Sequence, residues 1–182
     1  EASVGIYHDS VVSSQKQLYT KVGIVLGKYS QPALVEEFIK GREISVGVVG
    51  NEPEITLFPP LEFVFPEAKS TLEQIRSYEY KWGGKKEQMV RADLQRKTVK
   101  QLEYYTRVSY TATECRDYAR MDYRLDNAGN VYLLEVNYNP GIGPNTHGLN
   151  NTLTMMASFI GLSFEDFVER IVLTAAKRYG LS

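Results

Sequence analysis

Residues 116–137 read RDYARMDYRLDNAGNVYLLEVN. Apolar and polar side chains alternate over residues 116–125 and again over 131–137, which is typical of half-buried β-strands. Between them, the segment DNAGN at 126–130 is the strongest turn signal in the chain. The sequence therefore predicts a β-hairpin with one apolar face and one polar face.

The two faces of this hairpin follow from symmetric closure about the centre of the turn, because opposed residues of an antiparallel pair share a face. The apolar face, expected to form the core, then pairs Leu125 with Tyr132, Tyr123 with Leu134, and Met121 with Val136. On the polar face, Asp122 lies opposite Glu135. Arg120 lies opposite Asn137 on that same face.

Asp122 and Glu135 would repel each other, because opposed Cβ atoms are only about 4.5–5.5 Å apart. The basic side chains of Arg120 and Arg124 are expected on the same face and could neutralise them. A divalent cation could also do so, with the side-chain carbonyl of Asn137 as a further ligand. Hard oxygen donors suit Mg²⁺ or Mn²⁺ and disfavour zinc. A solvated polar face is the alternative, and the pattern alone favours it.

The segment that follows, NYNPGIGPNTHG at 137–148, is too rich in Gly, Pro and Asn to be regular. Such a loop exposes backbone N–H groups that can hold an anion, and Thr146 adds a hydroxyl group. A surface turn without a ligand explains the composition equally well.

The rest of the chain predicts an α+β fold, because helices and short antiparallel strands do not alternate regularly. Helices are expected at 13–28, with Ser13 or Ser14 as the N-cap, at 97–113, and from the capping-box-like Ser163 onward. Strands are expected at 33–39 and 44–50 about a turn at 40–42, and at 55–58 and 61–65. Residues 66–95 are interpreted as a long, partly structured loop.

The composition excludes several classes of protein. The chain has 182 residues, of which 43% are hydrophobic and 24% charged, and its net charge is −1. This length suits one domain or two small lobes. A balanced charge gives no field that would recruit nucleic acid or anionic lipid. Cys115 is the single cysteine, which excludes an intramolecular disulfide framework. No apolar stretch approaches the roughly 20 residues of a membrane span.

Five segments, in this order, resemble the ATP-grasp superfamily and, within it, the carboxy-terminal part of the D-alanine-D-alanine ligases. They are Ala2-Ser3-Val4-Gly5-Ile6, then LVEEFIKGRE at 34–43, Tyr78-Glu79-Tyr80-Lys81, Ala119-Arg120-Met121-Asp122-Tyr123, and Glu135-Val136-Asn137 with Pro140-Gly141. Their order and spacing agree over almost the whole chain. The resemblance overturns the preference for a solvated polar face.

The resemblance implies an ATP-grasp fold of antiparallel sheets and packed helices, with a nucleotide between two lobes. Residues 1–66 would form part of the small lobe and 67–182 the carboxy-terminal lobe, without the family's amino-terminal domain. The implied activity is that of a cytoplasmic, ATP- and Mg²⁺-dependent carboxylate–amine ligase that forms an acyl phosphate. The chain alone is expected to be inactive, and the full-length protein could be a homodimer. Its partners would be amino acids, with no nucleic acid and no membrane.

The resemblance also assigns roles to individual residues. The adenine would lie along Glu36, Glu37, Phe38 and Ile39, with Glu43 at the ribose, and Ser3 and Lys81 would bind the phosphates. Asp122, Glu135 and Asn137 would hold two Mg²⁺ ions, with Mn²⁺ as a substitute. Arg120, together with Lys81, would be catalytic and lie over the transferring phosphoryl group. Gly141 and Thr146 would hold the carboxylate of the incoming amino acid.

Three positions depart from the D-alanine-D-alanine ligase pattern. A Ser-Ser pair is replaced by Ala2-Ser3, a tyrosine by Trp82, and His-Ser by Asn145-Thr146. All three belong to the substrate half. Three functions therefore stay open: a ligase of the D-alanine-D-alanine type, a ligase for other amino acids or peptides, and a non-catalytic nucleotide-binding relative. The intact charged residues argue against the last, since two opposed carboxylates have no use in a decayed enzyme.

Overall fold

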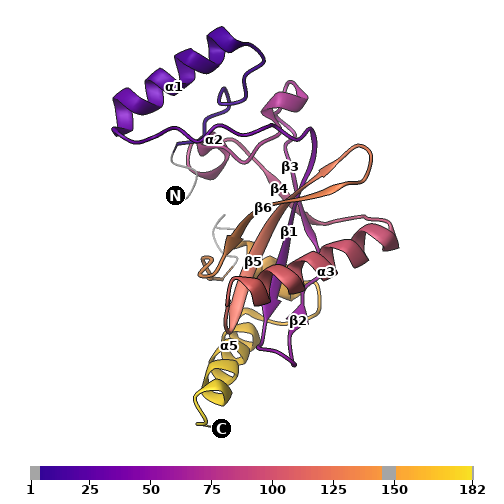
Figure 1. Cartoon of the computed structure of the whole chain (residues 1–182). Helices are drawn as coiled ribbons and strands as arrows, with labels where there is room; N and C mark the ends of the chain where they lie inside the picture. Colours follow the sequence, from indigo (N-terminus) through magenta and orange to yellow (C-terminus); the bar gives the residue numbers. More distant parts are fainter. Residues whose placement is uncertain (1–4, 145–150, 182) are drawn as a thin grey trace.

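The computed structural model describes residues 5–144 and 151–181 (Figure 1). Its helices are α1 (Gln15–Tyr29), α2 (Tyr78–Lys81), α3 (Arg96–Ala112), α4 (Thr152–Ser158) and α5 (Phe164–Arg178), with a 3-10 turn at Thr71–Glu73. Its strands are β1 (Gly41–Val49), β2 (Thr56–Leu57), β3 (Leu61–Val64), β4 (Gln88–Arg91), β5 (Tyr118–Asp126) and β6 (Val131–Asn137). These strands form one antiparallel sheet in the order β4-β3-β1-β5-β6, with β2 also paired to β1.

One face of the sheet packs against α3, which crosses it in Figure 1. Alternate residues of the two central strands point to this side, as the period of a β-strand requires. The resulting core contains Ile44, Val46 and Val48 of β1, Ala119, Met121, Tyr123 and Leu125 of β5, and Leu102 and Tyr110 of α3. This buried face fixes the direction in which the intervening polar residues point.

The opposite face is divided into an apolar part and a polar part. The apolar part lies under α4 and α5, where Leu153, Met156 and Phe167 pack against Phe58 and Val49. The polar part carries Glu43 of β1, Arg120, Asp122 and Arg124 of β5, and Glu135 of β6. The apolar cluster under α4 and α5 therefore supports the same sheet that presents the charged side chains.

The predicted hairpin is confirmed, but its register is correct only near its open end. The pairs Arg120–Asn137, Met121–Val136 and Asp122–Glu135 are observed. The predicted pairs Leu125–Tyr132 and Tyr123–Leu134 are wrong, because a bulge between Asp122 and Tyr123 shifts the pairing, so that Tyr123 faces Leu133 and Leu125 faces Val131. Leu134 is the extra residue on β6 and is 52% exposed.

The predicted hairpin at 33–50 is wrong in its first strand. Residues 33–40 belong to no strand of the described chain, and β1 begins at Gly41. Both edges of β1 are already occupied, by β5 on one side and by β2 and β3 on the other. No edge of β1 is left for residues 33–39 to pair with.

The predicted helices are confirmed with small shifts of their ends. Ser14 caps α1 through its side chain, and Ser163 with Asp166 forms a capping box at the start of α5. The short helix α4 is not anticipated by the sequence. The predicted loop at 66–95 holds the 3-10 turn, α2 and β4. The division into lobes at residue 66 stays a prediction, although the sheet takes strands from both sides of it.

Within the described residues, every helix is too short or too polar to cross a lipid bilayer.

Among the described glycines, Gly41 has the least room for a side chain. Its φ of +147° favours glycine, and a Cβ atom there would lie 2.0 Å from the backbone oxygen of Leu125. We therefore expect Gly41→Ala to lower the free energy of unfolding by about 2–4 kcal/mol. Thermal or denaturant unfolding measures this loss. The control is Gly23→Ala within α1, where nothing lies within 4 Å and the gain should be up to about 1 kcal/mol. Equal stability of the Gly41→Ala variant and the wild type would contradict the prediction.

Candidate active site

Two opposed carboxylates and an amide meet on the polar part of the sheet. Asp122 of β5 lies opposite Glu135 of β6. The side-chain amide of Asn137 donates to both, with 3.0 Å to Oδ2 of Asp122 and 3.1 Å to Oε1 of Glu135. Asp122 is largely buried, whereas Glu135 is exposed. The group is thus anchored at the sheet and open to solvent on one side.

Arg120 neutralises the buried carboxylate. Its guanidinium donates two parallel hydrogen bonds, from Nε to Oδ1 and from Nη2 to Oδ2 of Asp122, each 2.8 Å long. Burial alone would raise the pKa of Asp122, but the charge and hydrogen bonds of Arg120 outweigh it and hold that pKa below its ordinary value. A bidentate pair of this kind fixes both side chains in one orientation. Arg120 therefore lies fixed next to the two carboxylates.

Ser45 is a member of this group that the sequence analysis did not identify. It is fully buried, it faces Asp122 in the β1–β5 register, and its hydroxyl donates to Oδ1 of Asp122. The available signal was a serine within the apolar run ISVGVV at 44–49. A buried hydroxyl needs a partner, and here it orients the carboxylate.

Lys81 approaches the same group from a different segment. Lys81 is the last residue of α2. Two residues near the start of the chain contact this helix. The N–H of Tyr78 donates to the oxygen of Ile6 at 2.7 Å, and the backbone N–H and ring of His8 bind the carboxylate of Glu79. Burial is the main effect that lowers the pKa of Lys81. The charges of neighbouring arginines lower it further, while those of Asp122 and Glu135 act in the opposite sense. The ammonium group therefore lies within electrostatic range of both carboxylates.

The predicted adenine-binding residues, 36–39, lie in the extended segment that precedes β1. Glu36 and Glu37 are exposed, and Phe38 and Ile39 are half-buried. Glu43 follows on β1 and shares the sheet face of the carboxylate group. Burial raises the pKa of Glu43, although the charge of Arg124 opposes the rise. The structure thus places these residues at one end of the polar face.

The described part of the loop after β6, residues 138–144, is held by a side-chain hydrogen bond near each end. The hydroxyl of Tyr118 donates to Oδ1 of Asn139 at 2.6 Å. The hydroxyl of Thr154 in α4 donates to the oxygen of Gly143 at 2.7 Å. Gly141 lies between these anchors and is exposed. Ser3 and Thr146, the remaining predicted site residues, lie outside the described residues.

The side chains of Asp122, Glu135 and Asn137 are of the types that bind a hard divalent cation, but they would not complete its coordination by themselves. Among residues 5–144 and 151–181, no group of three or more His, Cys, Asp or Glu side chains is placed to hold a metal ion. Asp122 and Glu135 instead offer two carboxylates. The Asn137 amide presents its N–H group to both of them, so its oxygen would have to turn toward a bound cation to complete the set. Mg²⁺ commonly takes one or two carboxylates and completes its coordination with water and substrate phosphates. This donor set is what such a partly shared site needs.

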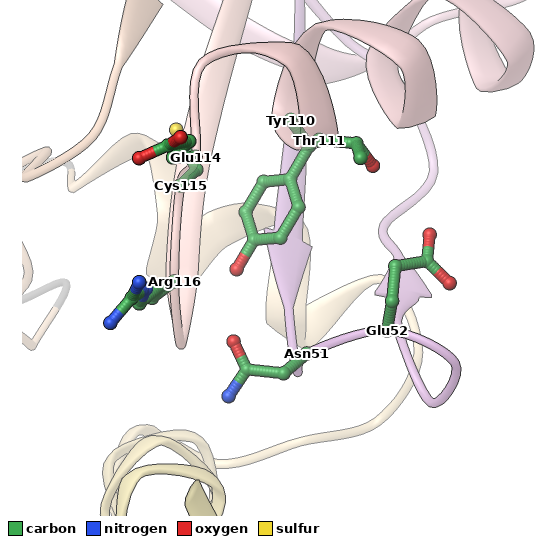
Figure 2. A pocket seen from close by; sticks show the side chains of 7 residues that line it. All are labelled: Asn51, Glu52, Tyr110, Thr111, Glu114, Cys115 and Arg116. Atoms are coloured by element: carbon green, nitrogen blue, oxygen red, sulfur yellow. The ribbon is translucent and has the colours of Figure 1, made fainter.

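A separate hollow of about 350 Å³ lies beyond the C-terminal end of β1 (Figure 2). Its lining includes Asn51, Glu52, Tyr110 and Cys115. The hydroxyl of Tyr110 donates to the oxygen of Gly50 at 2.8 Å, so it serves the fold. None of the predicted site residues lines this hollow.

Comparison with known proteins identifies the family. Residues 2–173 match the family described as "D-ala D-ala ligase C-terminus". The chain belongs to this family. It is 33% identical over 169 residues to the uncharacterised protein y4sG of Sinorhizobium fredii, with 93% of this chain and 48% of the relative covered. It is 32% identical over 176 residues to a D-alanine–D-alanine ligase of Geobacter sulfurreducens, with 96% and 50% covered. The chain thus spans about half the length of the curated relatives it matches.

Solved structures of these ligases share the fold. The D-alanine–D-alanine ligase of Bacillus anthracis complexed with ATP aligns with a TM-score of 0.70 at 19% identity, covering 91% of this chain and 48% of that one. The corresponding ligase of Coxiella burnetii aligns with a TM-score of 0.70 at 22% identity, covering 93% and 41%. The predicted α+β, ATP-grasp-type fold and the predicted family are therefore confirmed.

Proposed function

We propose that this chain supplies the nucleotide- and metal-binding part of an ATP-dependent ligase that joins a carboxylate to an amine through an acyl phosphate. The observation that carries the proposal is the opposed pair Asp122 and Glu135, bridged by Asn137 and flanked by Arg120, in a chain of the D-Ala-D-Ala ligase family. Relatives named as D-alanine–D-alanine ligases, and the ATP complex of one such enzyme, support it.

In this proposal the cationic side chains handle the phosphates. Phosphoryl transfer depends on positioning and charge neutralisation more than on covalent help from the protein. Lys81 would contact the phosphates as a point charge. Arg120, held by Asp122, would stabilise the charge on the transferring phosphoryl group. Asp122, Glu135 and Asn137 would hold Mg²⁺, which when bound supplies further positive charge at the phosphate oxygens.

The second step would use the same face of the sheet. When the amine attacks the acyl phosphate, charge develops on a tetrahedral oxygen, which fixed donors stabilise. Arg120 and the backbone N–H groups of the loop at 139–143, which Tyr118 and Thr154 anchor, would be suitable donors. Gly141 would hold the carboxylate of the incoming amino acid. Ser3 at the phosphates and Thr146 at that carboxylate remain proposals from sequence.

The amino acids themselves are the open part of the proposal. A ligase for other amino acids or peptides is the second candidate, favoured by Trp82. This residue follows Lys81, is 63% exposed, and offers only an indole N–H where the family has a tyrosine hydroxyl. Small-molecule substrates are common to both candidates. The cytoplasmic location and the homodimer stay predictions.

The test of the proposed function is amino-acid-dependent phosphate release by the natural gene product in the presence of ATP and Mg²⁺. We expect release only when a suitable amino acid is added, and its loss when the metal is chelated. The panel should contain D- and L-amino acids, singly and in pairs. Nucleotide binding without release for any member of the panel would favour a non-catalytic relative instead.

A further inference from the structure

Arg124 is a buried arginine that the proposed mechanism does not use. It lies on β5 on the same face as Arg120 and Asp122, and only 4% of its side chain is exposed. Its ion-pair partner is Glu43, which faces it across β1 and β5, with 3.2 Å between Nη1 and Oε2. One ion pair satisfies only one of the five guanidinium N–H groups. The others have a different purpose.

Three of the four remaining N–H groups of Arg124 donate to backbone oxygens, at the entry to β1 and in the irregular segment before α2. Nε donates to the oxygen of Ile39 at 3.0 Å and Nη2 to that of Gly41 at 3.1 Å. Nη1 also donates to the oxygen of Gln74 at 2.7 Å. In addition, the guanidinium lies 4.9 Å from the centre of the Phe38 ring. A single side chain thus joins residues 38–41 to the segment before α2.

Residues 33–40, here called the strap, need such a support. The strap pairs with no strand of the described chain, so a sheet ladder does not fix its backbone. Its residues 36–39 are those proposed to hold the adenine. The oxygen of Ile39 lies at the point where the strap enters β1, and the guanidinium holds it there. The position of the strap relative to the carboxylate group therefore depends on Arg124.

We propose that Arg124 is a positioning residue for the adenine nucleotide. By fixing the strap and the segment that carries Lys81, it sets the distance between the base-binding and phosphate-binding ends of the site. This inference rests on the proposed function, because it assumes a nucleotide between the strap and Lys81. It predicts a loss of affinity that is confined to ligands that contain the base.

Arg124→Lys is the test variant. Lysine keeps the positive charge next to Glu43, so the buried carboxylate is not left without a partner. It loses the planar fork, and one ammonium group cannot bind the oxygens of Ile39, Gly41 and Gln74 together. The loss of one or two hydrogen bonds to the strap should raise the Kd for MgATP about tenfold.

Calorimetric titration of the natural gene product with two probes separates positioning from a general structural role. The probes are MgATP and Mg-tripolyphosphate, which lacks base and ribose. We expect Arg124→Lys to weaken MgATP binding about tenfold and to leave Mg-tripolyphosphate binding within about twofold. In steady-state assays the KM for ATP should rise more than kcat falls. Amide exchange of residues 36–40 should accelerate while the β1–β5 ladder stays protected.

Arg42→Lys is the matched control. Arg42 also makes a two-pronged pair, with Glu62 at 2.7 and 2.5 Å, but it lies on the opposite face of β1. Its replacement should leave the binding of both probes unchanged. Equal weakening of both probes by Arg124→Lys, unchanged MgATP binding, or loss of the folded state before ligand is added would each overturn the inference. Failure of the wild type to bind either probe would refute the proposed function itself, which is a distinct result.

Discussion

Glu135→Gln is expected to reduce amino-acid-dependent phosphate release by about 100-fold or more, because it removes one of the two negative charges available to a metal ion. The fold should not change. Glu135 is exposed, and its oxygen Oε1 accepts a hydrogen bond from the amide of Asn137, which the glutamine oxygen can still accept. The measurement is phosphate release at saturating ATP over a range of Mg²⁺ concentrations, with thermal unfolding alongside.

A matched control for this variant is Glu54→Gln. Glu54 is exposed and pairs with Lys177 at 2.6 Å, away from the carboxylate group. This replacement also removes one charge, but it should leave phosphate release within about twofold and stability within about 0.5 kcal/mol. Wild-type activity of Glu135→Gln would exclude the metal assignment. Unfolding of that variant at a clearly lower temperature would show that Glu135 serves the fold instead.

Arg120→Lys is expected to lower kcat for phosphate release by about 100-fold, with a much smaller change in the KM for ATP. The charge is retained, but the two parallel hydrogen bonds that fix the side chain on Asp122 are not. The cation would then be free to move away from the transferring group. Lysine is preferred to methionine here, because an apolar residue would leave Asp122 buried without compensation and destabilise the protein by about 3–5 kcal/mol.

Arg178→Lys controls for the loss of a bidentate pair as such. Arg178 binds Asp117 through Nε at 3.0 Å and Nη2 at 2.6 Å, at the end of β5 where α5 packs. Its replacement should affect stability only slightly and leave kcat unchanged. Rate constants for both variants come from phosphate-release kinetics with ATP varied. Similar kcat values for Arg120→Lys and the wild type would remove Arg120 from the chemistry.

The sequence alone was sufficient to place the four central residues of the proposed site on one face. A strand shows its side chains to alternate faces, so the spacing of Arg120, Asp122, Glu135 and Asn137 in a hairpin with a clear turn places all four on one face. The structure bears this out. The register error further along the hairpin has a local cause, the extra residue at Leu134, and a β-bulge leaves no clear mark in an alternating pattern.

The positions of the strap, Ser45 and Arg124 could not be predicted from the alternation of side chains along a strand. The strap has the composition of a strand, yet it is not one, because both edges of β1 are taken by strands from elsewhere in the chain. Ser45 and Arg124 obtain their roles from partners 77 and 85 residues away, namely Asp122 and Ile39. No local pattern contains such partners.

Thus the sequence by itself determined the family, the α+β class and the charged face of the hairpin, because these depend on side-chain identity and on the two-residue period of a strand. The tertiary structure alone decided which segments surround that face. It placed Lys81 near the carboxylates, a serine beneath Asp122, and Arg124 between the strap and the sheet. The physical reason is that strand edges can be paired only once and buried polar groups must find partners, and both conditions are met only when the whole chain has folded.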